Sequence, residues 1–261
     1  MNNNHRNNRS TAPRNNQETT KNSYKKISTE RGDTLIYAMG GLGEVGKNMY
    51  CVEHDNELFI IDAGVKFAEE GLPGIDYVIP DYSYLKRNEK KIRGLMITHG
   101  HEDHIGGIPF LLQVVKIPFI YATPLASAMI KRKLDEKRLT NATKIIQIDD
   151  EYQIKSKYFN IGFFKTNHSI PESMGIIINS PNGRIVETGD FKFDLSPVGD
   201  PADYQKMSFL GETGVTLLMS DSTNSEVPTF SISEKKVANS VQEEFRKTEG
   251  RLIVATFASN V

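Results

Sequence analysis

The pattern of apolar and polar positions changes near Thr34. Before it, residues 1–30 are rich in Asn, Arg, Ser and Thr and contain almost no large apolar side chains. A stretch of this composition cannot bury enough surface to offset the entropy lost on ordering, so we predict a disordered, basic, Asn-rich tail over residues 1–30. From Thr34 onward, short apolar runs alternate with turn residues, which is typical of a domain built largely from strands.

The apolar runs predict both strands and helices. Runs rich in β-branched and aromatic residues predict strands at Leu35–Met39, Asn48–Glu53, Glu57–Ile61, Gly94–Thr98, Phe119–Tyr121, Lys157–Thr166, Gly175–Asn179, Arg184–Thr188 and Val215–Ser220. Longer amphipathic stretches predict helices at Ile108–Val115, Pro124–Leu139 and Ser233–Lys247, the last with Ser233 as its N-cap. Because few helices separate consecutive strands, we expect an α/β fold in which helices cover the outer faces of sheets, and not a doubly wound parallel sheet.

Composition narrows the class of protein. The 261 residues include one cysteine, Cys51, so no disulfide can form within the chain and a reducing, cytoplasmic location is the simplest prediction. No apolar run approaches the length of a membrane span. The net charge is −1, but the tail is basic and the remainder mildly acidic, which argues against nucleic-acid binding through bulk charge and leaves a local basic groove open. The tail is either a solvated segment or an arm that touches polyanions.

A Gly-rich segment matches a cofactor motif by its letters alone. Gly41, Gly43 and Gly46 have the spacing of the dinucleotide-binding fingerprint. That fingerprint requires a helix whose N-terminus faces the pyrophosphate, within a strand–helix–strand unit. Here the residues after the glycines, Asn48–Val52, have the pattern of a strand, so we interpret the segment as a loop between two strands.

The candidate chemistry lies in the segment from His99 to His104, which reads His-Gly-His-Glu-Asp-His. It follows a predicted strand directly, so its alternate residues can converge on one point. His168 and Asp190 also follow predicted strands. Without thiolates, a divalent metal site has to use imidazole and carboxylate ligands. The candidate metal ligands are His99, His101, Asp103, His104, His168 and Asp190.

The other polar residues near strand ends receive different predictions. Asp62 ends an apolar strand, and we expect its carboxylate to orient a ligand imidazole. His5 in the tail and His54 beside a turn have no potential ligands near them in sequence, and we expect both to be exposed. Six candidate ligands are too many for one tetrahedral ion but suit two ions bridged by a carboxylate. Such a pair suits phosphodiester hydrolysis, because one ion activates water and both stabilise the oxygens of the in-line displacement.

These residues also carry a resemblance. The pattern His-x-His-x-Asp-His, with Asp62 upstream and His168 and Asp190 downstream, resembles the metallo-β-lactamase superfamily. The blocks at residues 40–48, 74–81, 98–107, 166–173 and 188–194 are similar to bacterial ribonuclease J, in the β-CASP branch of that superfamily. The resemblance covers about Arg31 to Val261.

The resemblance implies a four-layer αββα sandwich and specific roles for the residues. His99, His101 and His168 would hold one Zn²⁺, Asp103 and His104 the second, and Asp190 would bridge both, with Asp103 and Asp190 as the catalytic carboxylates. Mn²⁺ is the alternative metal. Asp221 would orient a catalytic histidine further along a longer chain. Gly74 and Asp76 resemble a segment that binds a structural Ca²⁺, although a plain turn accounts for them as well.

The resemblance also implies an activity and a domain division. The activity is a cytoplasmic 5′-to-3′ exoribonuclease and endonuclease of RNA maturation and mRNA decay, which prefers 5′-monophosphorylated RNA. It would form a homo-oligomer or a paralogue complex at full length, with no membrane association. Because the family is longer than this chain, we expect an incomplete metallo-β-lactamase domain over 31–231, the start of an inserted β-CASP domain over 232–261, and little or no activity of this chain alone. A small-molecule hydrolase of the same superfamily and a non-catalytic RNA-decay scaffold are the alternatives.

Overall fold

The computed structural model describes residues 32–69 and 71–256 of the chain. The predicted tail over 1–30 and His5 lie outside these residues. The strands are β1 (Thr34–Gly40), β2 (Met49–His54), β3 (Glu57–Ile61), β4 (Lys66–Phe67), β5 (Tyr77–Val78), β6 (Ile92–Met96), β7 (Phe119–Ala122), β8 (Lys144–Gln147), β9 (Ile154–Lys155), β10 (Asn160–Lys165), β11 (Met174–Ser180), β12 (Gly183–Glu187) and β13 (Leu217–Met219). The helices are α1 (Ser83–Arg87), the 3-10 turn η1 (Glu89–Lys91), α2 (Glu102–Ile105), α3 (Ile108–Val114), α4 (Pro124–Glu136), α5 (Tyr204–Thr213) and α6 (Glu234–Lys247).

Most of these strands form two sheets. The first has the order β1-β2-β3-β6-β7-β8, in which β1, β2 and β3 pair antiparallel and β3, β6, β7 and β8 run parallel. The second has the order β13-β12-β11-β10-β9, with antiparallel pairs except for the parallel pair of β12 and β13. β4 and β5 form a separate two-stranded ribbon. The parallel strands of the first sheet therefore all end at one edge.

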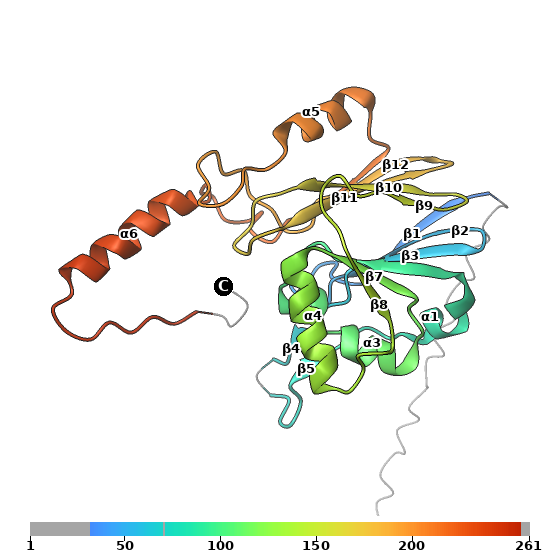
Figure 1. Ribbon diagram of the computed structural model, residues 1–261, viewed down its shortest axis with the longest axis horizontal. Coiled ribbons are helices and arrows are strands. Elements are labelled where there is room, and N and C mark those ends of the chain that lie inside the picture. The colour runs from blue at the N-terminus through green and yellow to red at the C-terminus, as the bar shows by residue number, and fades with distance from the viewer. Residues whose placement is uncertain (1–31, 70, 257–261) are drawn as a thin grey trace, which may run out of the picture. The chain divides into compact units, whose positions relative to one another are not determined.

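Because successive side chains point to opposite faces of each strand, the apolar residues form three layers. In β3, Leu58 and Ile60 pack against the helices, whereas Phe59 and Ile61 pack between the two sheets. The outward side chains of the second sheet pack with Leu210 of α5. Figure 1 shows α3 and α4 on one side of the paired sheets and α5 on the other. The result is the predicted four-layer αββα sandwich, with side chains alternating as the period of a strand requires.

The strongest sequence patterns are confirmed and the short elements were missed. Glu57–Ile61 forms β3 as predicted, and the predicted helices correspond to α3, α4 and α6 within a few residues. The Gly-rich segment is a loop between the antiparallel strands β1 and β2, as interpreted. The short helices α1 and α2, the longer α5, and the strands β4, β5, β8 and β9 were not predicted. The missed short elements lack both a clear period and a distinct apolar run between turn residues, and α5 carries only a weak apolar stripe.

The prediction that His54 is exposed is wrong. Its side chain is buried, with Nδ1 3.0 Å from the Thr34 hydroxyl and its ring centroid 4.6 Å from that of Tyr158. Tyr158 comes from the segment before β10, so the second sheet covers the end of β2. A turn position in sequence could not reveal this contact between the two sheets.

Ser233 occupies the N-cap of α6 but does not cap it with its side chain. Its hydroxyl lies 2.7 Å from that of Ser196, and the Glu234 backbone N–H donates instead to Asp194 at 2.8 Å. The cap is therefore supplied from a distant loop. Residues 32–256 belong to one compact unit, and the predicted boundary between 231 and 232 stays a prediction. In the part of the chain described, no helix has the length and apolarity that crossing a membrane requires.

The interior position of Leu95 gives a stability prediction. Leu95 in β6 is fully buried against the helices, so Leu95→Ala leaves a cavity and should lower the free energy of unfolding by about 2–5 kcal/mol. Leu218→Ala in β13 is the matched control, since Leu218 is 60% exposed and its loss should cost less than about 0.5 kcal/mol. Urea unfolding measures both; equal losses would contradict the packing described.

Candidate metal centre

The candidate residues meet where strands of both sheets end. Asp62 follows β3 and His99 follows β6 in the first sheet, while His168 and Asp190 follow β10 and β12 in the second. A buried contact between the two loops of the first sheet brings them together. The Ala63 N–H donates to the His104 carbonyl at 2.8 Å.

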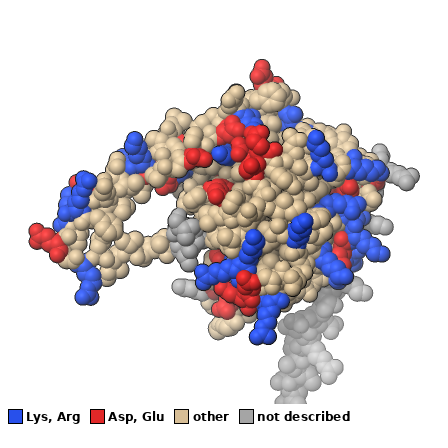
Figure 2. All heavy atoms as spheres, in the orientation of Figure 1, with Lys and Arg blue, Asp and Glu red and all other residues tan. Residues whose placement is uncertain are grey.

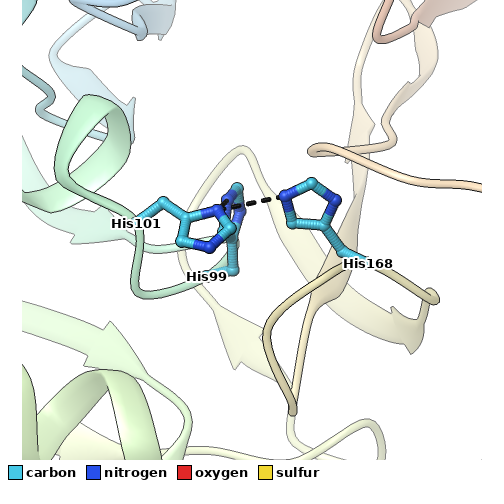
Figure 3. Close-up of side chains that lie close together, drawn as sticks. All are labelled: His99, His101 and His168. Carbon is cyan, nitrogen blue, oxygen red and sulfur yellow. Dashed lines mark hydrogen bonds between the residues drawn. The ribbon is translucent and has the colours of Figure 1, made fainter. Parts of the chain in front are cut away.

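Three imidazoles converge on one point. The Nδ1 atom of His101 lies 3.1 Å from Nε2 of His99 and 3.1 Å from Nε2 of His168, as Figure 3 shows. Nitrogens bound to one tetrahedral Zn²⁺ at about 2.0–2.1 Å lie about 3.3 Å apart. The spacing of these nitrogens therefore fits a single ion between them.

A second group forms around His104. Its Nε2 lies 3.5 Å from Oδ2 of Asp103 and 3.4 Å from Oδ1 of Asp190. The other oxygen of Asp190, Oδ2, lies 3.6 Å from Nε2 of His168. The Asp190 carboxylate thus presents one oxygen to each group. His99, His104 and Asp190 also bring ligand atoms within 4.8 Å of one another, whereas Asp103 belongs to neither compact group of three.

Asp62 fixes two of the imidazole rings. Its Oδ2 lies 2.7 Å from His104 Nδ1 and accepts a hydrogen bond from the Thr98 hydroxyl at 2.8 Å. Since that hydroxyl donates to Asp62, it is left to accept from His99 Nδ1 at 3.0 Å. Both rings therefore present Nε2 to the centre, which is the arrangement by which buried partners orient metal-binding histidines. The Asp62 backbone has a φ of 56°, a left-handed conformation that Asp adopts more readily than most residues.

The charges of the site call for a cation. Burial and the neighbouring imidazoles hold the pKa of His99 well below its ordinary value, so this ring is neutral and can act as a ligand. Burial alone would lower the pKa of His104, but Asp62, Asp103 and Asp190 outweigh it and raise that pKa well above the ordinary value. Burial raises the pKa of Asp103 and Asp190, yet the hydrogen bond and charge of His104 bring both below their usual range. Ionised carboxylates therefore surround the positively charged His104 ring, and the same carboxylates would balance the charge of a bound divalent ion.

Two residues at the site were missed by the sequence analysis. Asn48, after the Gly-rich loop, lies with Nδ2 3.3 Å from Asp103 Oδ2 and 3.2 Å from His104 Nε2, and its backbone N–H donates to the Asp103 carbonyl at 3.0 Å. Glu187 ends β12 as a buried carboxyl, and burial, with the charges of Asp62 and Asp190, raises its pKa to about 8. Glu187 follows Ile185 at an inward position, and this period of two was the signal that could have found it.

A cleft of about 800 Å³ leads to the His104 group. The Gly-rich loop, the end of β12 and the loop after β13 line it, and apart from His104 its ionisable side chains with charge near neutral pH are acidic: Glu44, Asp62, Asp103, Asp190, Asp221 and Glu226. No Lys or Arg is among the described residues that line it. Without bound cations, this cleft would repel an anionic substrate.

The remaining predicted residues belong to neither group of ligand atoms. Asp221 lines the cleft and accepts from the Thr223 hydroxyl at 2.6 Å and from the Thr223 N–H at 2.7 Å. Gly74 and Asp76 lie in the exposed connection between β4 and β5, and the compact ligand groups found among the described residues do not include Asp76. The assignment of ions to these residues, including Ca²⁺, stays a prediction.

Comparison with known proteins defines the class. A family model described as the metallo-beta-lactamase superfamily matches residues 42–221, so the chain belongs to this superfamily. Its fold is similar to that of a protein of unknown function from Enterococcus faecalis V583 (TM-score 0.62, 18% identity, 82% of this chain and 57% of that one). It is also similar to the short form of human tRNase Z (TM-score 0.50, 17% identity, 81% of this chain and 88% of that one).

Within the superfamily, the chain is homologous to ribonucleases J. It is 54% identical to ribonuclease J 1 of Streptococcus pyogenes over 90% of this chain and 42% of that protein. It is 46% identical to ribonuclease J of Mycoplasma genitalium over 87% of this chain and 40% of that protein. The chain therefore spans about two fifths of the length of these relatives.

The close approach of two loops gives a prediction at Gly64. A Cβ added to Gly64 would lie 1.6 Å from the backbone oxygen of Asp103, so Gly64→Ala should push the loops apart. We expect a loss of about 1–3 kcal/mol or more in the free energy of unfolding. Gly162→Ala is the matched control, because an added Cβ there meets nothing within 4 Å. Thermal unfolding compares the two, and equal stability would refute the clash.

The raised pKa of Glu187 gives a pH prediction for the metal-free protein. An ordinary Glu loses its proton near pH 4.5, whereas folded Glu187 keeps it to about pH 8. Between these values the folded state holds more protons than the unfolded state, so stability falls as the pH rises, by at most about 1.4 kcal/mol per pH unit. Glu187→Gln should remove this dependence, and Glu249→Gln at an exposed position should not. Urea unfolding in the presence of chelator, repeated across this pH range, measures the free energy of unfolding of each variant. Parallel pH profiles for wild type and Glu187→Gln would contradict the claim.

Proposed function

We propose that this chain carries the metal centre of a ribonuclease that cleaves RNA phosphodiester bonds by hydrolysis with two metal ions. The observation that carries the proposal is the paired geometry of the centre. Nδ1 of His101 lies 3.1 Å from Nε2 of His99 and 3.1 Å from Nε2 of His168, and the Asp190 carboxylate has one oxygen toward each group. Homology to proteins named ribonuclease J supports RNA as the substrate. The proposal extends to 5′-to-3′ exonuclease and endonuclease activity in RNA maturation and mRNA decay in the cytoplasm.

The donor set suits two ions of zinc or manganese. His99, His101 and His168 would hold one ion, and Asp103 and His104 would hold the second, with Asp190 between them. Divalent ions bound here would activate water and stabilise the charge on the phosphate oxygens. The imidazole groups match borderline divalent cations, and the carboxylates supply the negative charge that balances them.

The residues of this chain supply the rest of the chemistry. Asp103 is held by Asn48 through one of its oxygens, at 3.3 Å, and its lowered pKa keeps it ionised. Its carboxylate is thus placed to orient the attacking water and accept its proton. Asp62 and Thr98 hold two imidazole rings and restrict their rotation, so the ligand atoms keep their positions as charge develops.

The acidic lining of the cleft makes substrate entry depend on bound cations. A phosphate group reaching His104 passes several carboxylates and, among the lining residues described, no Lys or Arg. Cations at the centre would reverse the sign of the local field. The preference for a 5′-monophosphate and assembly into a homo-oligomer or paralogue complex are further parts of the proposal, which rest on homology to ribonuclease J.

Cleavage of 5′-monophosphorylated RNA by the purified chain, with protein in excess over RNA so that slow turnover is visible, tests the proposal. We expect cleavage that requires Zn²⁺ or Mn²⁺. His101→Ala should lower the metal content and abolish cleavage, because one lost imidazole leaves an incomplete shell. Asp103→Asn should keep the fold and lower cleavage by at least about 100-fold, as expected for loss of a proton acceptor.

The matched control is His54→Ala, which removes a buried imidazole remote from the strand ends that form the centre. It should retain metal and metal-dependent cleavage. Hydrolysis of a thioester or a β-lactam without cleavage of RNA would favour a small-molecule hydrolase. Metal binding with no cleavage of any substrate, in the chain and in a longer protein that contains it, would favour a non-catalytic scaffold.

A further inference from the structure

A second hollow lies at the opposite edge of the first sheet. The parallel strands β3, β6, β7 and β8 begin at Glu57, Ile92, Phe119 and Lys144. A groove of about 900 Å³ runs past the starts of β6, β7 and β8 and is lined by Lys90, Lys116 and Lys144. The metal-centre residues follow the other ends of β3 and β6. A strand of five residues separates the two edges by about 17 Å.

Two basic segments meet at this groove. Residues 86–93 contain five Lys or Arg and one Glu, and residues 137–144 contain three Lys or Arg and no acidic residue. Figure 2 shows Lys and Arg side chains gathered over the part of the surface where Figure 1 places α1, whose last two residues, Lys86 and Arg87, begin the first segment. Lys86, Lys91 and Arg93 pair with Glu89, Glu53 and Glu57, and the other cations of the two segments still leave this edge positive, opposite to the cleft at the metal centre.

The cations that line the groove are available to a ligand. Lys90, Lys116 and Lys144 are exposed and form no ion pair within 4.0 Å with any residue that the structure describes. The one acidic residue of the lining, Glu89, already accepts from Lys86 Nζ at 2.8 Å and from the Lys116 N–H at 3.0 Å. Three positive charges thus line the groove against the single negative charge of Glu89.

The rest of the groove suits a chain with both polar and apolar parts. Its apolar lining includes the buried side chains of Ile92, Leu112 and Val115. Thr140, Asn141 and Thr143 also line it and contribute polar side chains.

We propose that this groove binds the phosphate backbone of single-stranded RNA at a site separate from the metal centre. Lysine side chains recognise phosphates as point charges, and the apolar floor accepts ribose and base surfaces. The choice of RNA among the possible polyanions rests on the proposed function. The position of the groove comes from the structure and does not depend on that function. Because the acidic cleft offers no Lys or Arg among its described lining residues, the groove supplies affinity for RNA about 17 Å or more from the reacting phosphate.

Binding of fluorescein-labelled oligouridylate to the chain, followed by anisotropy in chelator over a range of KCl concentrations, tests the proposal. Each lysine–phosphate contact on a single strand contributes about 0.7 to the slope of log K against log salt. The triple variant Lys90→Ala/Lys116→Ala/Lys144→Ala should lower this slope by about 2 and weaken binding about 10- to 100-fold at 0.1 M salt.

The matched control removes equal charge elsewhere. Lys235→Ala/Lys236→Ala/Arg246→Ala changes exposed residues of α6 and should leave the slope unchanged. A groove variant with wild-type affinity and slope would overturn the proposal, as would an equal loss in the α6 variant. Binding of polyglutamate in place of oligouridylate would overturn the choice of RNA.

Metal content separates this proposal from the proposed function. The groove variant should bind as much Zn²⁺ as wild type, and His101→Ala should keep its RNA affinity in chelator. If RNA binds through the groove but is never cleaved, the ribonuclease proposal is contradicted and the groove proposal stands. Cleavage that is unaffected by the groove variant, at RNA concentrations below saturation, would contradict the groove alone.

Discussion

The buried carboxylate of Asp62 is the interaction on which the rest of the site depends. It receives the Thr98 N–H at 2.8 Å, the Thr98 hydroxyl at 2.8 Å and lies 2.7 Å from His104 Nδ1, so it joins the ends of β3 and β6 to α2. Its left-handed backbone turns the chain toward Gly64, where the absence of a side chain lets the Asp103 backbone approach. A charged group can remain this deeply buried only because its hydrogen bonds replace those of water.

The two edges of the first sheet carry charges of opposite sign. The ends of the strands carry carboxylates around His104, and the starts of the strands carry Lys90, Lys116 and Lys144. Carboxylates at that density favour bound cations, whereas lysines in excess over acidic residues favour a polyanion. One sheet thereby separates the place where phosphodiester chemistry is proposed from the place where affinity for RNA is proposed. The near-zero net charge of the chain conceals this separation.

The sequence predicted the elements with a clear period and the residues with distinctive chemistry. β3 was predicted to the residue because its apolar run ends at turns on both sides, and the αββα architecture agreed with the strand-rich pattern. The cluster from His99 to His104 was recognisable because its ligand types are rare and close in sequence. Its ligand atoms do converge with those of His168 and Asp190.

What the sequence could not predict depends on contacts between distant segments. Asn48 contacts Asp103 through both its side chain and its backbone N–H, and nothing in its neighbours along the sequence indicates that contact. His54 was expected to be exposed because it stands beside a turn, but the second sheet covers it. The groove needed residues from three separated segments, none of which carries a recognisable binding motif by itself.

The central claim is that the imidazoles and carboxylates at the strand ends form a site for two metal ions. Anomalous diffraction from crystals of the protein grown with Zn²⁺ tests it most directly. We predict one peak within about 2.0–2.1 Å of the facing nitrogens of His99, His101 and His168, and a second beside His104, with Asp190 between the two. An anomalous map with no peak at these side chains, in crystals that contain Zn²⁺ elsewhere, would contradict the account.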